Sequence, residues 1–191
     1  MSTIALFHPS FGITEGIKDA ERRLQAAGHD VHVIDYYGDG QTFTDYDVAN
    51  QYVDKIGFPV LMQRALSGVS DLPDGFIAMG FSNGAGMATY VALNRIVDSV
   101  ILCSGALPIE MLGAKTWPNG TSAQLHYMLE DPKKVDGSVE SVMRSVNQAN
   151  ADAEYLQYPG DGHLFTDSSQ KDEYDQATAE RLWLHVLRYL S

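Results

Sequence analysis

A serine lies between two glycines at residues 80–84, which read GFSNG, directly after an apolar run. The apolar run is typical of a buried parallel strand, and the residues that follow, 83–94, are typical of a helix. A strand that turns sharply into a helix strains the residue at the bend and leaves no room for neighbouring side chains, which explains Gly80 and Gly84. The sequence therefore predicts that the Ser82 hydroxyl projects above a sheet at the positive end of a helix, where an oxyanion is stabilised.

Short apolar runs alternate with amphipathic segments along the whole chain. Candidate strands lie at residues 3–8, 30–35, 75–80, 99–103, 123–128 and 153–158. Candidate helices lie at residues 15–27, 45–56, 59–69, 83–94, 138–150 and 171–190. Strands that alternate with helices form parallel sheets with both faces covered. We therefore expect residues 1–191 to form one α/β domain, with a mostly parallel sheet of about six strands, helices on both faces and no large cap domain.

The composition limits the classes of partner. The chain has 13 Lys and Arg against 25 Asp and Glu, which gives a formal net charge of −12. Nucleic acid and anionic membranes repel such a charge, so neither is expected as a partner. The amino terminus lacks the features of a signal peptide, and no stretch reaches the roughly eighteen apolar residues of a membrane helix, so we expect a cytoplasmic protein. The single cysteine, Cys103, lies in an apolar run and is expected to be a small buried hydrophobe.

A serine attacks a carbonyl group efficiently only if a base accepts its proton and a third group holds that base. His163 lies in a glycine-rich loop after the last predicted strand, at the end of the sheet where Ser82 is expected, and we predict that it is the base. His8 ends the first predicted strand at the same edge, where it is expected to order the next loop through a hydrogen bond. The remaining histidines are expected to be structural: His29, His32, His126 and His185.

The acid that orients His163 should follow the preceding strand at the same edge of the sheet. Two adjacent carboxylates, Glu130 and Asp131, stand there before a proline. We favour Asp131, because the proline fixes a tight turn and the shorter side chain suits a rigid orienting role. Glu130 is the alternative, and a surface role for both remains open, whereas Asp136 stands too close to the following helix.

Two backbone N–H groups are needed to stabilise an oxyanion. One belongs to Asn83, the residue after the serine, and we predict that the other belongs to Ser10, in the loop after the first strand. Pro9 cannot serve, because proline has no N–H.

Aromatic residues near this expected site are candidates for a substrate pocket. The pocket residues that we predict are Phe11, Tyr36, Tyr37 and Phe165. Phe43 and Tyr46 belong to the same aromatic-rich loop as the two tyrosines. Packing of these side chains under a long loop is an equally acceptable interpretation.

Several stretches together resemble the dienelactone hydrolase family of α/β-hydrolases. They are residues 4–12 (IALFHPSFG), 26–31 (AAGHDV), 34–37 (IDYY), 80–84, 125–131 and 158–165 (YPGDGHLF), and they occur in the family's order over nearly the whole chain. The resemblance implies a compact α/β-hydrolase fold and hydrolysis of an ester or lactone through a covalent intermediate. It also implies a triad of Ser82, Asp131 and His163.

The sequence departs from the family pattern at three positions. Ser82 stands where the type enzymes have a cysteine nucleophile, and Pro9 stands where they have a glutamate. Asp167 occupies the position of an arginine that binds the substrate carboxylate, and an acidic group there would repel a carboxylate.

The leading hypothesis is a serine esterase that acts on a small-molecule ester or lactone and needs no metal or organic cofactor. A thioesterase or a carbon–carbon hydrolase with the same triad is the first alternative. A non-catalytic, hydrolase-like binding module is the second.

Overall fold

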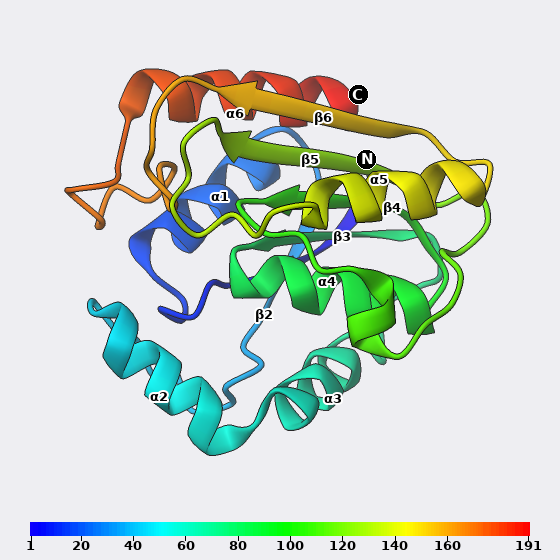
Figure 1. Cartoon of the computed structure of the whole chain (residues 1–191), viewed down its shortest axis with the longest axis horizontal. Coiled ribbons are helices and arrows are strands. Elements are labelled where there is room, and N and C mark those ends of the chain that lie inside the picture. Colours follow the sequence, from blue (N-terminus) through cyan, green and yellow to red (C-terminus); the bar gives the residue numbers. More distant parts are fainter.

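Six strands form at the six predicted positions, with ends that shift by one or two residues. The computed structural model describes residues 1–191 and joins these strands into one sheet (Figure 1). The strands are β1 (Thr3–Phe7), β2 (Asp30–Ile34), β3 (Phe76–Phe81), β4 (Val97–Cys103), β5 (Ser122–Met128) and β6 (Ala153–Tyr158). All neighbouring pairs are parallel, in the order β2-β1-β3-β4-β5-β6. The predicted mostly parallel sheet of about six strands is confirmed.

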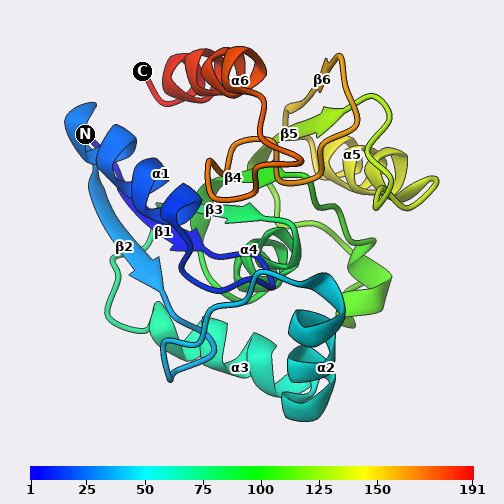
Figure 2. The same cartoon turned by 90° about the vertical axis from the view of Figure 1, so that its left-hand side faces the viewer.

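Six helices surround this sheet. They are α1 (Glu15–Ala26), α2 (Tyr46–Ile56), α3 (Phe58–Gly68), α4 (Asn83–Asn94), α5 (Ser138–Gln148) and α6 (Gln176–Tyr189). Figure 2 shows α1 and α6 on one face and α3, α4 and α5 on the other. Each face buries its own apolar cluster, as expected for a parallel sheet covered on both sides.

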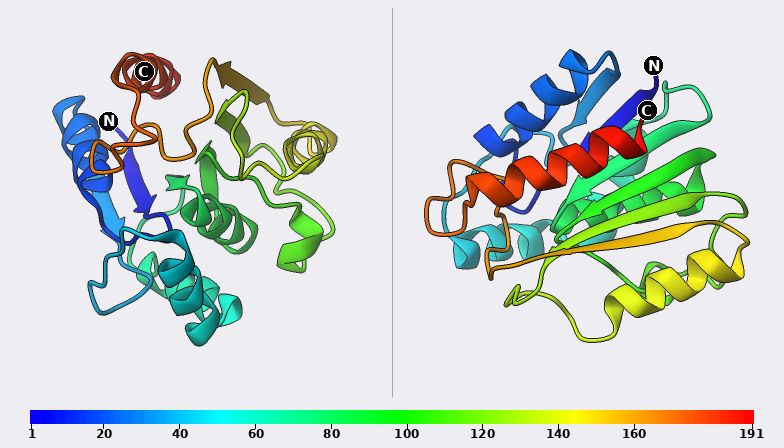
Figure 3. Two further views of the ribbon diagram at one scale, coloured as in Figure 1. Left: turned by 60° about the vertical axis from the view of Figure 1, so that its left-hand side comes forward. Right: turned by 90° about the horizontal axis from the view of Figure 1, so that it is seen from above.

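Helices α1 and α6 lie side by side over the same strands (Figure 3). Arg23 of α1 reaches Glu180 of α6 through two hydrogen bonds of 2.6 and 3.1 Å. Because both side chains are partly exposed, the pair adds little stability, and the buried apolar stripes of the two helices hold this layer together.

The last helix is shorter than predicted. It begins at Gln176, where the prediction began at residue 171, because the Asp175 side chain accepts a 2.7 Å hydrogen bond from the Thr178 N–H and caps the first turn. A short 3₁₀ helix, Ile109–Leu112, was not predicted. No helix combines the length and the apolar character that crossing a membrane requires.

The chain connections change direction across the sheet at the neighbouring strands β1 and β3. Chain connections lead from β1 outward to β2, then back to β3 and on to the opposite edge at β6. The loops after β1 and β3 therefore separate at the carboxyl ends of the strands, which is where parallel α/β sheets form their ligand sites. Helix α2 packs over this end of the sheet, because its buried Ala49 clusters with Phe11 and Leu164 from the loops after β1 and β6.

Candidate active site

Ser82 occupies the bend between β3 and α4 in a conformation that side chains rarely adopt. Its φ and ψ are 52° and −117°, outside the common regions for an L-residue. A Cβ at Gly80 would overlap the carbonyl oxygen of Gly84, and one at Gly84 would overlap those of Phe7 and His8. The two glycines therefore let the chain turn sharply and let α4 start directly against the loop after β1.

Three side chains from distant segments meet at this bend. The Ser82 Oγ lies 2.7 Å from Nε2 of His163, and Nδ1 of His163 lies 2.8 and 2.9 Å from the two carboxylate oxygens of Asp131. Because an ionised carboxylate only accepts hydrogen bonds, the imidazole proton belongs on Nδ1. Nε2 of the neutral ring is then free to accept the Ser82 proton. His163 and Asp131 are both buried, which shields their interaction from water.

The structure places Asp131, and not Glu130, against His163. The Asp131 Oδ1 also accepts a 2.9 Å hydrogen bond from the Lys133 N–H, in the tight turn that follows β5. Glu130 and Asp136 are exposed to solvent and have no hydrogen bond to the imidazole. Burial of Asp131 also removes the interpretation in which it is only a surface group.

His126, the buried histidine of β5, is held by hydrogen bonds to two neighbouring side chains. Nε2 of His126 lies 2.8 Å from the Gln124 side-chain oxygen and Nδ1 lies 2.8 Å from the Tyr158 hydroxyl. Burial, together with nearby His185, lowers the pKa of His126 to about 3. The ring is therefore neutral, with both nitrogens satisfied. Burial likewise raises the pKa of the Cys103 thiol, which makes it a poor nucleophile.

The two backbone groups predicted to bind an oxyanion lie on segments in direct contact. Asn83 is the first residue of α4, and the first N–H groups of a helix have no acceptor within it. Ser10 lies in the buried loop after β1, and its N–H donates to no group of the protein. The close approach of Gly84 to the His8 carbonyl brings this loop against the start of α4.

The four predicted pocket residues are all buried, with exposures of 0–1%. Tyr36 and Tyr37 lie beneath the loop after β1, and Phe165 packs 5.7 Å from the ring of Tyr158. These three side chains therefore do not face an open cavity, in contrast to the prediction; they fill space under loops because each is apolar enough to join the core. Phe11 alone borders an open cleft.

That cleft has a volume of about 320 Å³ and lies between the start of α2 and the loop before α6. Four of its nine lining residues are acidic and one is basic: Phe11, Thr44, Asp45, Tyr46, Asp47, Gln170, Lys171, Asp172 and Glu173. The ring of Tyr46 lies 4.4 Å from that of Phe11 and 6.3 Å from the imidazole of His163, which places the cleft next to the triad. In the sequence Tyr46 belongs to the aromatic-rich loop, and no local feature indicates that its ring approaches His163.

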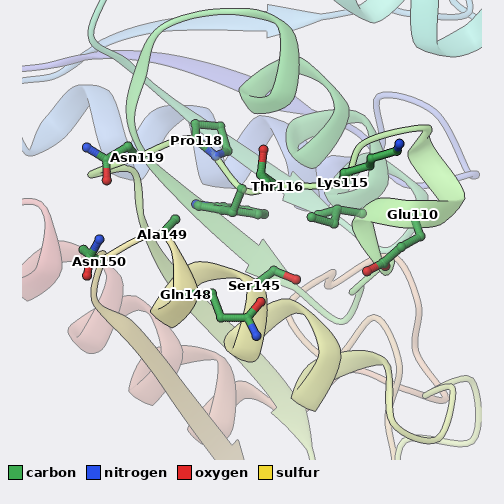
Figure 4. A pocket seen from close by; sticks show the side chains of 11 residues that line it. Glu110, Lys115, Thr116, Pro118, Asn119, Ser145, Gln148, Ala149 and Asn150 are labelled. Atoms are coloured by element: carbon green, nitrogen blue, oxygen red, sulfur yellow. The ribbon is translucent and has the colours of Figure 1, made fainter.

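A larger cavity, of about 470 Å³, lies at the opposite end of the sheet (Figure 4). Its lining residues precede β5 and β6 or end α5, among them Trp117, Asn119 and Gln148. Ser82, Asp131 and His163 do not line this cavity. Size alone therefore does not mark the site in this protein.

Asp167 lies inside the protein, beside the start of α1. It is buried, and its Oδ1 accepts hydrogen bonds from the Gly16 N–H at 3.0 Å and from Ser169 N–H and Oγ at 2.9 and 2.6 Å. A Cβ at Gly16 would overlap this carboxyl group. Asp167 therefore ties the His163 loop to the first turn of α1, and the expectation that it would repel a substrate carboxylate is not supported by its position.

No group of three or more His, Cys, Asp or Glu side chains is arranged to hold a metal ion. The chemistry available at the site is that of the hydroxyl, the imidazole and the carboxylate described above, together with the backbone N–H groups beside them.

Comparison with known proteins agrees with this architecture. The model of the dienelactone hydrolase family matches residues 1–191. A search of curated protein sequences gave no significant match.

Three solved structures show the fold shared with this chain. One is a dienelactone hydrolase-like promiscuous phosphotriesterase from metagenomic libraries, with a TM-score of 0.80, 21% identity and coverage of 99% of this chain and 85% of that chain. A second is a structure described with LipS and LipT, two metagenome-derived lipolytic enzymes, with a TM-score of 0.64, 13% identity and coverage of 98% and 93%. The third is a thioesterase domain from the curacin biosynthetic pathway, with a TM-score of 0.62, 14% identity and coverage of 96% and 90%.

The family model spans the whole chain, and the same fold occurs in a phosphotriesterase, in a thioesterase domain and among lipolytic enzymes. This protein belongs to the dienelactone hydrolase family.

Proposed function

We propose that this chain is a serine hydrolase that cleaves a carboxylic ester or lactone of a small molecule through an acyl-enzyme. The observation that carries the proposal is the unbroken hydrogen-bonded series from Ser82 Oγ to Nε2 of His163 and from Nδ1 to Asp131. A hydroxyl, a base and an orienting acid at these distances have the geometry that nucleophilic catalysis requires.

The reaction proceeds in two halves. In the first, Ser82 Oγ attacks the carbonyl carbon while Nε2 of His163 takes the hydroxyl proton. The tetrahedral intermediate then collapses, and the imidazolium gives that proton to the leaving alcohol oxygen. In the second half, His163 takes a proton from water, the resulting hydroxide attacks the acyl carbon, and the proton returns to Ser82 as the acid leaves.

The carbonyl oxygen gains negative charge in both halves. In this proposal the N–H groups of Asn83 and Ser10 donate to it, and the amino end of α4 adds its dipole. Asp131 keeps the proton of the resting imidazole on Nδ1 and stabilises the imidazolium, without being protonated itself. The three side chains suffice for this chemistry without a metal ion or an organic cofactor.

The charge of the protein favours an uncharged or cationic substrate. The net charge is −12, and the cleft beside His163 carries Asp45, Asp47, Asp172 and Glu173. Both nucleic acid and an anionic membrane surface would be repelled, so the proposed partner is a small molecule.

Thioester hydrolysis by the same triad is the second candidate. It is favoured by the shared fold of the thioesterase domain, and a thioester needs the same attack and the same oxyanion contacts. A carbon–carbon hydrolase would also use the same triad. A binding module without activity is the remaining alternative.

A fluorophosphonate probe tests the proposal directly, because it forms a covalent adduct with an activated serine. We expect one adduct per chain at Ser82, and we expect its loss in Ser82→Ala and in His163→Ala. Glu130→Gln serves as the matched control, since it neutralises the carboxylate next to Asp131 without touching the imidazole. A folded wild-type protein that the probe does not label would favour the binding module. Aryl esters, thioesters and lactones of increasing acyl length then separate the remaining candidates.

A further inference from the structure

Three consecutive carbonyl groups of the loop after β1 are each held by a buried side chain. The Tyr36 hydroxyl donates to the His8 carbonyl oxygen at 2.7 Å, and the Tyr37 hydroxyl donates to the Ser10 carbonyl oxygen at 2.7 Å. Between them, Nδ1 of His8 donates to the Pro9 carbonyl oxygen at 2.8 Å, since a carbonyl oxygen can only accept. The Gly12 N–H makes a second bond of 3.0 Å to the same Pro9 oxygen.

Holding the Pro9 and Ser10 carbonyl groups fixes the direction of the N–H groups of the residues that follow them, Ser10 and Phe11. A trans peptide is planar, so the carbonyl of one residue and the N–H of the next point in opposite directions. There are no cis peptide bonds in this chain. The bond from His8 to the Pro9 carbonyl therefore sets the direction of the Ser10 N–H, which has no acceptor within the protein.

The side chains that hold the loop are themselves rigid. The imidazole of His8 stacks on the ring of Tyr36, with centroids 3.9 Å apart and planes 10° apart, and the ring of Tyr37 meets it edge-on at 4.8 Å. All three are essentially without solvent exposure. On its other side, Nε2 of His8 lies 3.6 Å from Oδ1 of Asp35.

Asp35 is fixed and ionised. Its pKa is held well below the usual range by His8 first, and then by hydrogen bonds from the Gly38 and Gly40 N–H groups. The same carboxylate accepts a 3.1 Å hydrogen bond from the Tyr37 N–H. Asp35 thus holds the loop after β2, whereas His8, Tyr36 and Tyr37 direct their side-chain hydrogen bonds at the loop after β1.

We propose that His8, held by Tyr36 and Tyr37, is a positioning residue that aims the Ser10 N–H at the oxyanion formed during acyl transfer. This assignment rests on the proposed function, because it concerns the place where that oxyanion forms. His8, Tyr36 and Tyr37 thus do more than pack. The loop after β1 has no regular secondary structure to fix its peptide planes, and the hydrogen bonds of these three side chains fix them instead.

The test compares His8→Leu with His8→Asn by steady-state kinetics on an aryl acetate, normalised to the number of fluorophosphonate-reactive sites. Leucine removes the donor, and we expect kcat to fall by about 10- to 100-fold with KM unchanged, since the oxyanion contact acts in the transition state. Affinity for an alkylboronic acid, whose tetrahedral adduct carries an oxygen in the same place, should weaken in parallel. Asparagine places an amide donor near the position of Nδ1 and should restore most of the lost rate.

Tyr37→Phe and Tyr189→Phe form a matched pair that separates positioning from packing. Each removes one tyrosine hydroxyl with a 2.7 Å hydrogen bond, but Tyr189 bonds to Ser122 at the start of β5, far from the loop. We expect both variants to lose some stability, and only Tyr37→Phe to lose kcat per reactive site.

Two results would contradict the inference. The first is a His8→Leu variant with unchanged kcat per reactive site, or with a higher KM alone. The second is a crystal structure of His8→Leu in which the Pro9–Ser10 peptide keeps its orientation. If the fluorophosphonate does not label the wild-type protein, the proposed function fails and this inference fails with it. If the wild type is labelled and the His8 variants match it, this inference alone fails.

Discussion

The Ser82 hydroxyl and the imidazole of His163 lie 2.7 Å apart although 81 residues separate them in the chain. Ser82 leaves β3 near the middle of the sheet, whereas His163 comes from the loop after β6 at its edge. The loop after β6 must therefore cross back over the ends of β4 and β5. Asp131 lies after β5, below this crossing, and its carboxylate accepts the hydrogen bond from Nδ1 of His163.

Removing the orienting carboxylate should leave the fold intact and disable the base. Asn at position 131 can donate to Nδ1, which would move the imidazole proton to Nε2, where it can no longer accept from Ser82. We expect Asp131→Asn to lower kcat by about 10³- to 10⁴-fold, with little change in KM. Glu130→Gln should remain within about twofold of the wild type, as an exposed substitution outside the site. If Glu130→Gln were the damaging change, Glu130 would be the triad acid.

A methyl group at Gly84 should disrupt the contact between α4 and the loop after β1. It would overlap the carbonyl oxygens of Phe7 and His8, which belong to rigid backbone. We expect Gly84→Ala to lower the free energy of unfolding by about 3 kcal/mol and to reduce activity by displacing the Ser10 loop. The measurement is urea unfolding together with kcat per fluorophosphonate-reactive site.

Gly113→Ala is the control for this change, because Gly113 has a φ of +81° and open space around it. Its cost should be about 1 kcal/mol from backbone strain, with activity retained. Equal losses in the two variants would show that the close approach at Gly84 has no special role.

Acid should destabilise the protein partly through His126. Its pKa is lowered to about 3 in the folded state and is ordinary in the unfolded chain. The unfolded state therefore binds a proton that the folded state does not, so this contribution to stability is complete above about pH 6.5 and is lost as the pH falls towards 3. Relative to pH 7, His126 should account for about 2 kcal/mol of lost stability at pH 5.

The check is urea unfolding of the wild type and of His126→Gln at pH 7 and pH 5. The variant should lose about 2 kcal/mol less than the wild type between the two pH values. Parallel losses in both proteins would show that His126 is not the titrating group.

Asp167 should matter for stability rather than for substrate binding. Asp167→Ala leaves the Gly16 N–H without its 3.0 Å acceptor and releases Ser169. We expect a loss of about 1–3 kcal/mol in urea unfolding, whereas Asp161→Ala, at an exposed position in the same loop, should change stability by less than about 0.5 kcal/mol. A stable Asp167→Ala protein with altered selectivity for carboxylate-bearing esters would instead place Asp167 at the substrate.

The acidic cleft beside His163 should discriminate against anionic esters. An aryl ester with a carboxylate on its acyl chain should show about tenfold lower kcat/KM than its neutral isostere at low salt, and the gap should narrow in about 1 M salt. The double variant Asp47→Asn and Asp172→Asn, which alters two exposed cleft residues, should also narrow the gap. A gap that responds to neither change would mean that substrates do not pass this cleft.

The sequence by itself determined the fold class and the position of the sharp bend that carries Ser82. Buried parallel strands are continuous apolar runs, and the bend at Ser82 needs glycines on both sides, so the local sequence predicts both features. It also predicts that the glycine-rich loop with His163 lies at the same end of the sheet, because this loop comes directly after a strand.

Only the tertiary structure decided which side chain, among neighbours in the sequence, contacts the site. Glu130 and Asp131 are adjacent carboxylates, and the turn held by the Lys133 N–H determines which of them reaches His163. Tyr36 and Tyr37 carry no local signal that separates a pocket wall from a support under a loop, because that depends on where the loop after β1 runs. Asp167 likewise took its role from the approach of α1, a segment about 150 residues away in the chain. Local sequence encodes backbone conformation, whereas the direction of a side chain depends on what distant segments place beside it.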